Sequence, residues 1–166
     1  MTNRRRALFT ALAGVAVGST LTFAQLEGRK VQVSMHLDRR PVEPVDRELA
    51  TFYDALLRCL RRPEARDGDW QLWNCRPAWE GNPSHQQFIV TSWQLGEQRL
   101  LAVVNYGSTQ AQCYVTLGLP GLAGNSFTLV DLLSGIEYER KGDELGGKGL
   151  YLDMPPWGHH IFELRR

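Results

Sequence analysis

The stretch RLLAVVNYGSTQAQCYVTL, Arg99–Leu117, decides the fold class. In its second half Gln112, Tyr114 and Thr116 alternate with the apolar residues Ala111, Cys113, Val115 and Leu117. Alternation with a period of two is typical of a β-strand with one buried face. The first half, Arg99–Tyr106, is a second candidate strand, and Gly107-Ser108 between the two are turn residues. The stretch therefore predicts two neighbouring strands joined by a turn.

The same period continues through most of the chain from Asp69 onward. The other candidate strands are Trp70–Cys75, Gln87–Trp93, Phe127–Leu133, Ile136–Arg140, Leu150–Met154 and His159–Leu164. Turn residues separate these segments, and they follow one another too closely for the helical crossovers that parallel strands require. The pattern predicts a mainly β protein, an antiparallel β-sandwich of the Greek-key type, over residues 67–166.

Composition restricts the class of protein. The 166 residues carry 19 basic and 18 acidic side chains, which argues against a nucleic-acid partner because phosphates demand a basic excess. With 43% hydrophobic and 22% charged residues, the chain resembles an ordinary folded domain and neither a disordered tail nor a polytopic membrane protein.

One strong helix is predicted before the strands. Asp46 is a good N-cap, and a single apolar stripe follows it, formed by Leu49, Phe52, Tyr53, Leu56, Leu57 and Leu60. Arginines gather near its C-terminal end, where cations suit the helix dipole, and Pro63 is expected to end it. This amphipathic helix and the extended segment before it form a linker over residues 25–66.

The first residues, 1–24, allow two interpretations. Arg4-Arg5-Arg6 followed by an uncharged stretch to Ala24 matches a signal peptide, and the paired arginines resemble a twin-arginine export signal. Alternatively, a buried helix to about Val15 and a short strand over Ser19–Phe23 would form one unit of an α/β architecture. A stable membrane span is not expected, because the uncharged stretch is short and interrupted by glycines.

A search for catalytic or metal-binding groups finds no motif. Three cysteines, Cys59, Cys75 and Cys113, exclude a fully paired disulfide framework and lack zinc-site spacing, so each is interpreted as a buried or half-buried thiol. The acidic pairs Asp67/Asp69 and Asp143-Glu144 are interpreted as solvated turn residues. The sequence therefore predicts no metal and no cofactor.

The tryptophans are the remaining candidates for a binding site. An aromatic ring can stack on a sugar, although a tryptophan more often serves as a core or interface residue. Trp73, Trp79 and Trp93 are the candidates expected to be exposed, either as a carbohydrate-binding platform or as an interface with a neighbouring domain.

Three segments resemble a known family. RLLAVVNYGSTQAQCYVTL, the motif DLLSG at Asp131–Gly135, and the tail around it from Phe127 to Leu164 resemble the C-terminal β-sandwich domain of the α-amylase family of glycoside hydrolases. The segment around FYDALL resembles the connection between the catalytic barrel and that sandwich. GSTLTFAQLE, from Gly18 to Glu27, partially matches the family pattern at the end of the eighth barrel strand.

The resemblance implies that residues 1–24 are the last helix and strand of a (β/α)8 barrel. The family's catalytic carboxylates lie on earlier barrel strands, so none maps onto this chain. The implied function is the non-catalytic C-terminal portion of an α-amylase-like glycoside hydrolase, inactive alone.

Its expected partners are an α-glucan and a separate catalytic barrel polypeptide. The alternatives are a stand-alone, exported carbohydrate-binding module and a small interaction sandwich with no role in sugar binding. The unpaired cysteines favour the cytoplasm, whereas the signal-like start favours export.

Overall fold

The computed structural model describes residues 26–29 and 42–166. Both interpretations of residues 1–24 therefore fall outside the described residues, as does most of the extended segment before the predicted helix. Among the helices that the structure describes, none combines the length and apolar character needed to cross a membrane.

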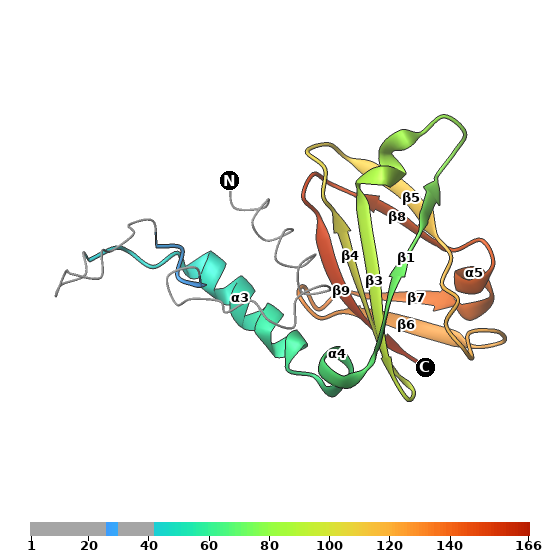
Figure 1. The fold of residues 1–166 in the computed structure, drawn as a ribbon, viewed down its shortest axis with the longest axis horizontal. Coiled ribbons are helices and arrows are strands. Elements are labelled where there is room, and N and C mark those ends of the chain that lie inside the picture. The colour runs from blue at the N-terminus through green and yellow to red at the C-terminus, as the bar shows by residue number, and fades with distance from the viewer. Residues whose placement is uncertain (1–25, 30–41) are drawn as a thin grey trace.

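Within the described residues, nine strands form two antiparallel sheets. Figure 1 shows how the sheets are arranged. The six-stranded sheet has the order β1 (Asp69–Trp73), β3 (Phe88–Leu95), β4 (Gln98–Asn105), β9 (His159–Arg165), β6 (Ser126–Asp131) and β7 (Glu137–Lys141). The three-stranded sheet has the order β2 (Cys75–Pro77), β5 (Ala111–Val115) and β8 (Leu150–Met154). The prediction of a mainly β, antiparallel sandwich is confirmed.

The first predicted strand is two strands. Trp70–Cys75 divides at Asn74, where the chain leaves the edge of one sheet as β1 and joins the edge of the other as β2. Two short helical segments within the sandwich were not predicted: η1 (Pro83–Gln87) precedes β3, and α5 (Gly142–Gly146) lies between β7 and β8. Each fills a connection that the sequence pattern suggested was a loop.

The main core lies between the two sheets. The alternation seen in the sequence is reproduced there, because Ala111, Cys113 and Val115 are all 0% exposed. Val103, from β4, and Leu152, from β8, belong to the same buried cluster. Burying such side chains contributes about 1.5–3 kcal/mol each relative to leaving them in water, so this interior accounts for the close packing of the two sheets.

Asn105 fixes one end of the sandwich. This fully buried side chain ends β4 and donates through Nδ2 to the carbonyl oxygens of Thr109, Met154 and Pro155, at 2.8, 3.2 and 2.9 Å. Its Oδ1 accepts from the backbone N–H of Gly107. The Asn105 amide therefore joins the β4–β5 turn to the loop between β8 and β9. These hydrogen bonds explain why a polar side chain is buried at the end of an apolar strand.

The predicted helix is confirmed as α3 (Arg47–Leu60). The Asp46 carboxylate accepts from the Leu49 N–H at 3.0 Å, as expected of an N-cap. The apolar stripe is buried at Leu49, Tyr53 and Leu56, and Cys59 continues it. Pro63 begins a second helix, α4 (Pro63–Asp67), in the first-turn position where proline needs no donor.

Both helices lie on the outer side of the six-stranded sheet (Figure 1): α4 contacts β3 and β4, and apolar side chains of α3 reach the outer face. The stripe of α3 shares a buried cluster with Trp93, Leu100 and Ile161, from β3, β4 and β9. The Phe52 ring meets His159 of β9 edge-on, with 5.2 Å between the ring centroids. The central strands β3, β4 and β9 are therefore buried on both faces, by the core between the sheets on one side and by α3 on the other.

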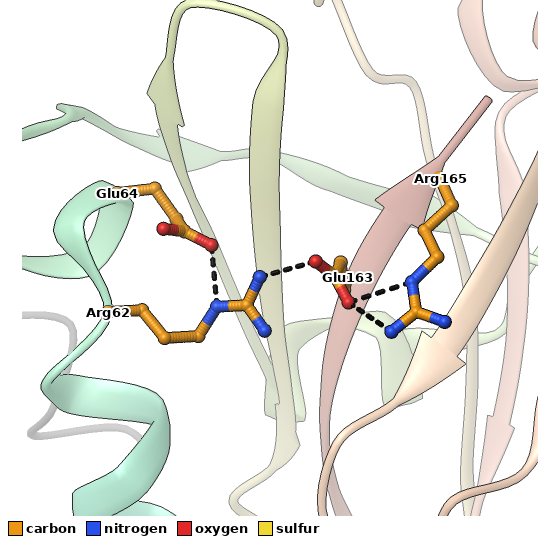
Figure 2. Close-up of polar contacts among 4 residues, drawn as sticks. All are labelled: Arg62, Glu64, Glu163 and Arg165. Carbon is orange, nitrogen blue, oxygen red and sulfur yellow. Dashed lines mark hydrogen bonds and ion pairs between the residues drawn. The ribbon is translucent and has the colours of Figure 1, made fainter.

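An ion-pair network fastens the helices to the sheet, as Figure 2 shows. Arg62, between α3 and α4, donates through Nε to Glu64 at 2.6 Å and through Nη2 to Glu163 of β9. Arg165 completes the network on Glu163 through Nε at 2.9 Å and Nη2 at 2.6 Å. Glu64 is 1% exposed, so its charge depends on Arg62 for compensation.

Replacing Arg62 is expected to destabilise the fold. Arg62→Met leaves a buried carboxylate without its cation and should lower the free energy of unfolding by about 3 kcal/mol, measured by urea titration. The matched control is Arg66→Met, which breaks an exposed pair with Asp67. The control should change the urea midpoint little, because water screens exposed ion pairs. Equal losses in the two variants would contradict the role given to Arg62.

Candidate functional site

The three candidate tryptophans do not form one surface. Trp73 packs against the core between the sheets, whereas Trp93 belongs to the cluster beneath α3 on the opposite face of the same sheet. Trp93 is 7% exposed, so the expectation that it is exposed is wrong. The strand pattern placed its side chain on a face of the sheet, but only the packing of α3 shows that this face is covered.

Trp73 is held in place at the end of β1. Its indole Nε1 donates to the Ser92 hydroxyl on β3 at 2.8 Å, and its ring packs partly into the core. It also lines an open depression of about 590 Å³ at the sheet edge, together with Trp70, Leu72 and Cys75. One edge of Trp73 is thus available to a ligand, but most of the side chain has a structural role.

Trp79 is the most exposed of the three candidates. It lies in the turn between β2 and η1 and is 56% exposed. The chain turns back behind it, where the Asn82 N–H donates to the Trp79 carbonyl oxygen at 3.2 Å. A presented indole of this kind suits stacking on a sugar or on another protein.

A second apolar surface lies on the outer face of the six-stranded sheet. Trp70 is paired with Trp93, and Leu72 with Thr91, so both point to the face that α3 covers further along. Beyond the helix, Trp70 and Leu72 are partly exposed to solvent, at 46% and 56%. Leu95, nearby on β3, is 38% exposed. We call Trp70, Leu72 and Leu95 the β1 patch.

Asp131, of the DLLSG motif, organises the turn after β6. Its carboxylate is 1% exposed and accepts from the Ser134 hydroxyl at 2.5 Å and the Leu133 N–H at 3.2 Å. It also binds His160 Nδ1 at 2.9 Å and the Ile161 N–H at 3.3 Å, both on β9. Gly135 closes the turn with φ of +77°, a conformation that glycine adopts without strain.

The Asp131 cluster is structural in its geometry. Ser134 and His160 both bind the same carboxylate oxygen, Oδ2, so the serine donates its proton to Asp131 and not to an imidazole base. Burial opposes ionisation of Asp131, but hydrogen bonds from His160, Ser134 and Leu133 outweigh it and lower the pKa of the carboxyl group. Asp131 therefore functions as an ionised anchor between β6 and β9.

One member of each acidic pair found in the sequence has a structural partner. Asp67 is bound by Arg66, and Asp143 Oδ1 accepts from the Gly124 N–H at 2.9 Å. Among the described residues, no three His, Cys, Asp or Glu side chains gather closely enough to hold a metal ion.

Sequence reasoning missed two features of this surface. Trp70 and Leu72 alternate with Gln71 in the predicted strand Trp70–Cys75, but only the position of α3 shows that their shared face is exposed there. Asp131 and His160 are 29 residues apart, and their pairing follows from the register of β6 with β9. In the sequence, the motif DLLSG was the signal that drew attention to Asp131.

The pKa of Asp131 makes stability depend on pH in the acid range. Because folding lowers this pKa, the stabilisation is complete above the ordinary value of 3.8 and is lost as the pH falls through the folded value. Asp131→Asn should cost about 2 kcal/mol at neutral pH and should flatten the dependence of the urea midpoint on acid pH. Some dependence should remain, since the pKa of Glu163 is also lowered, by Arg165 and Arg62, against the opposing effect of burial. Parallel profiles for the variant and the wild type would contradict this assignment.

Comparison with known proteins shows the fold of this chain. No family model and no curated protein matches the sequence, but solved structures do. An α-amylase from Geobacillus thermoleovorans, complexed with acarbose, has a TM-score of 0.68 at 16% identity, over 100% of this chain and 34% of that chain. A maltogenic α-amylase from Thermotoga neapolitana has a TM-score of 0.69 at 10% identity, over 99% of this chain and 37% of that chain.

A third match is a debranching enzyme from Nostoc punctiforme, with a TM-score of 0.60 at 19% identity, over 96% of this chain and 29% of that chain. The chain thus spans about a third of the length of each solved chain. At these identities the likeness concerns the fold. The chain has the fold of the C-terminal region of α-amylase-family enzymes.

Proposed function

We propose that this chain is the C-terminal portion of an α-amylase-like glycoside hydrolase that acts on α-glucans. In this proposal the sandwich carries no catalytic group and supports a catalytic (β/α)8 barrel, supplied by a longer form of the chain or by a separate polypeptide. The chain alone is then inactive. The names of its structural neighbours, two α-amylases and a debranching enzyme, support the choice of α-glucans as the substrate class.

The β1 patch is the observation that carries this proposal. Trp70 and Leu72 extend the same sheet face that α3 covers, so the apolar surface continues past the helix without its own cover. Completely burying side chains of this size contributes about 1.5–3 kcal/mol each. Trp70 and Leu72 are about half buried already, at 46% and 56% exposed, so a neighbouring domain packed beside α3 and against β1 would obtain the remaining part of this stabilisation.

The ion-pair network around Arg62 is also consistent with a domain that supports its neighbour. Arg62 and Glu163 fix α3 and α4 against β9, so the helices and the β1 patch form one rigid surface. A supporting domain needs such rigidity, because a loosely attached helix would transmit no orientation to the domain beside it. We include a cytoplasmic location in the proposal, on the ground of the three unpaired thiols.

The proposal makes a prediction about the hydrolytic activity of the chain and its association with a catalytic polypeptide. The purified chain should not hydrolyse amylose. Where a separate polypeptide supplies the barrel, this α-glucan-hydrolysing polypeptide should bind the tagged chain in an extract of its source cells. The double variant Trp70→Ser/Leu72→Ser should lose that activity from the bound fraction, because it makes the β1 patch polar. Its circular dichroism should not change, since both side chains are exposed.

The matched control for this experiment is Tyr151→Ser. Tyr151 is 44% exposed on β8, in the other sheet, so its loss removes a similar aromatic surface away from the patch. The control should retain the hydrolytic activity in full. Hydrolysis of amylose by the chain alone, or equal retention by the patch variant, would overturn the proposal.

The exposure of Trp79 favours one alternative, a stand-alone carbohydrate-binding module. In that case amylose or glycogen in a native gel should retard the chain, and Trp79→Ala should abolish the retardation. Trp73→Ala is a poorer test, because it also removes the hydrogen bond to Ser92 and a part of the core. Our proposal predicts unchanged mobility for both the wild type and Trp79→Ala, and clear retardation of the wild type would favour the alternative.

A further inference from the structure

The three cysteines occupy different environments. Cys59 lies on α3 in the cluster on the outer face of the six-stranded sheet. Cys75, on β2, and Cys113, on β5, both face the core between the two sheets. Two of the three thiols thus share one interior, and the third is separated from them by the thickness of a sheet.

The register of β2 with β5 brings Cys75 and Cys113 together. Cys75 is paired with Val115 and Pro77 with Cys113, so the cysteines are diagonal neighbours on the same face of the ladder. Each thiol lies close enough to the other to shift its pKa. Diagonal Cα atoms lie about 7–8 Å apart in general, slightly beyond the usual span of a disulfide. A bond between the sulfurs therefore requires β2 to move a short distance toward β5.

The structure permits that movement. β2 has three residues and forms the edge of its sheet, so it is paired on one side only. Arg76 restrains it through Nη2, which donates to Thr116 Oγ1 at 3.0 Å and to the Lys148 carbonyl oxygen at 2.7 Å, but these contacts are exposed. Exposed side-chain contacts rearrange at little cost, whereas β5 is fixed between two neighbours.

The two thiols also differ in access and ionisation. Cys75 is half-buried and lines the open depression at the sheet edge, so a small oxidant can reach it. The Cys113 thiol lowers the pKa of Cys75 by hydrogen bonding, against the opposing effect of burial. Cys113 is 0% exposed, and the same hydrogen bond together with burial raises its pKa. The reactive thiolate is therefore Cys75, with Cys113 behind it.

We propose that Cys75 and Cys113 are a peroxide-sensitive thiol pair that forms a reversible disulfide within the sandwich. The Cys75 thiolate attacks hydrogen peroxide, the O–O bond breaks, and a sulfenic acid and hydroxide form. The Cys113 sulfur then attacks the Cys75 sulfur, the S–O bond breaks, and the oxygen leaves as water with the Cys113 proton. Two electrons pass from the sulfurs to the peroxide, and a dithiol reductant reverses the change.

The test is a thiol count on the folded protein after treatment with hydrogen peroxide. Denaturing thiol titration should find three free thiols before treatment and one after it, with a mass loss of about 2 Da for the two hydrogens removed. Peptide mapping should show the Cys75–Cys113 link in the monomer, and dithiothreitol should restore the three thiols. The oxidised monomer should unfold at higher urea concentration, because the link restricts the unfolded chain.

Variants assign the roles. Cys59→Ser is the matched control and should form the same link. Cys113→Ala should leave a Cys75 sulfenic acid that dimedone labels, and Cys75→Ser should form no link. If Cys113→Ala fails to fold, maleimide labelling of the wild type still identifies the reactive thiol. Cys75 should then react faster than Cys59 and Cys113. Three thiols remaining after peroxide, a link through Cys59, or disulfide dimers would each overturn the proposal.

Discussion

A six-stranded sheet presents two apolar faces, and the rest of the structure depends on covering both. The three-stranded sheet covers the inner face with residues such as Val115 and Leu152, and α3 covers the outer face over Trp93 and Ile161. A helix with one apolar stripe is stable mainly through such packing and much less through its own propensity. The network of Arg62, Glu64 and Glu163 then fixes where the helix and sheet meet.

The same constraint connects the fold to the proposed role. The helical cover stops short of β1, and the edge of the outer face is left with Trp70 and Leu72 exposed. An apolar surface that continues a buried face is a natural place for another domain to pack. The sandwich supplies a rigid base for that surface, with Asp131 joining β6 to β9 and Asn105 joining the turns at the β4 end.

Much of the fold could be predicted from the sequence because its signals are local. The alternation at Ala111–Leu117 indicated β5, and the N-cap at Asp46 indicated the start of α3. The division of the first strand at Asn74 could not be predicted, because a change of sheet within one extended segment leaves the alternation unchanged. The burial of Trp93 was also missed, since it depends on a helix distant in the sequence.

The candidate site was less accessible to sequence reasoning. Exposed aromatic residues were expected from strand patterns, but only tertiary packing separates the presented Trp79 from the buried Trp93. The pairing of Cys75 with Cys113 depends on strand register, which short edge strands specify weakly. Long-range pairings of this kind become visible only when the sheet order is known.

The central claim is that this sandwich works beside a catalytic barrel. Its most direct test is the mass and composition of the native protein, isolated from its source cells with an antibody raised against residues 67–166 and assayed on amylose. We expect a longer chain, or a stable complex with a second polypeptide, that hydrolyses the α-glucan. An isolated 18.8 kDa monomer without activity and without a partner would contradict it.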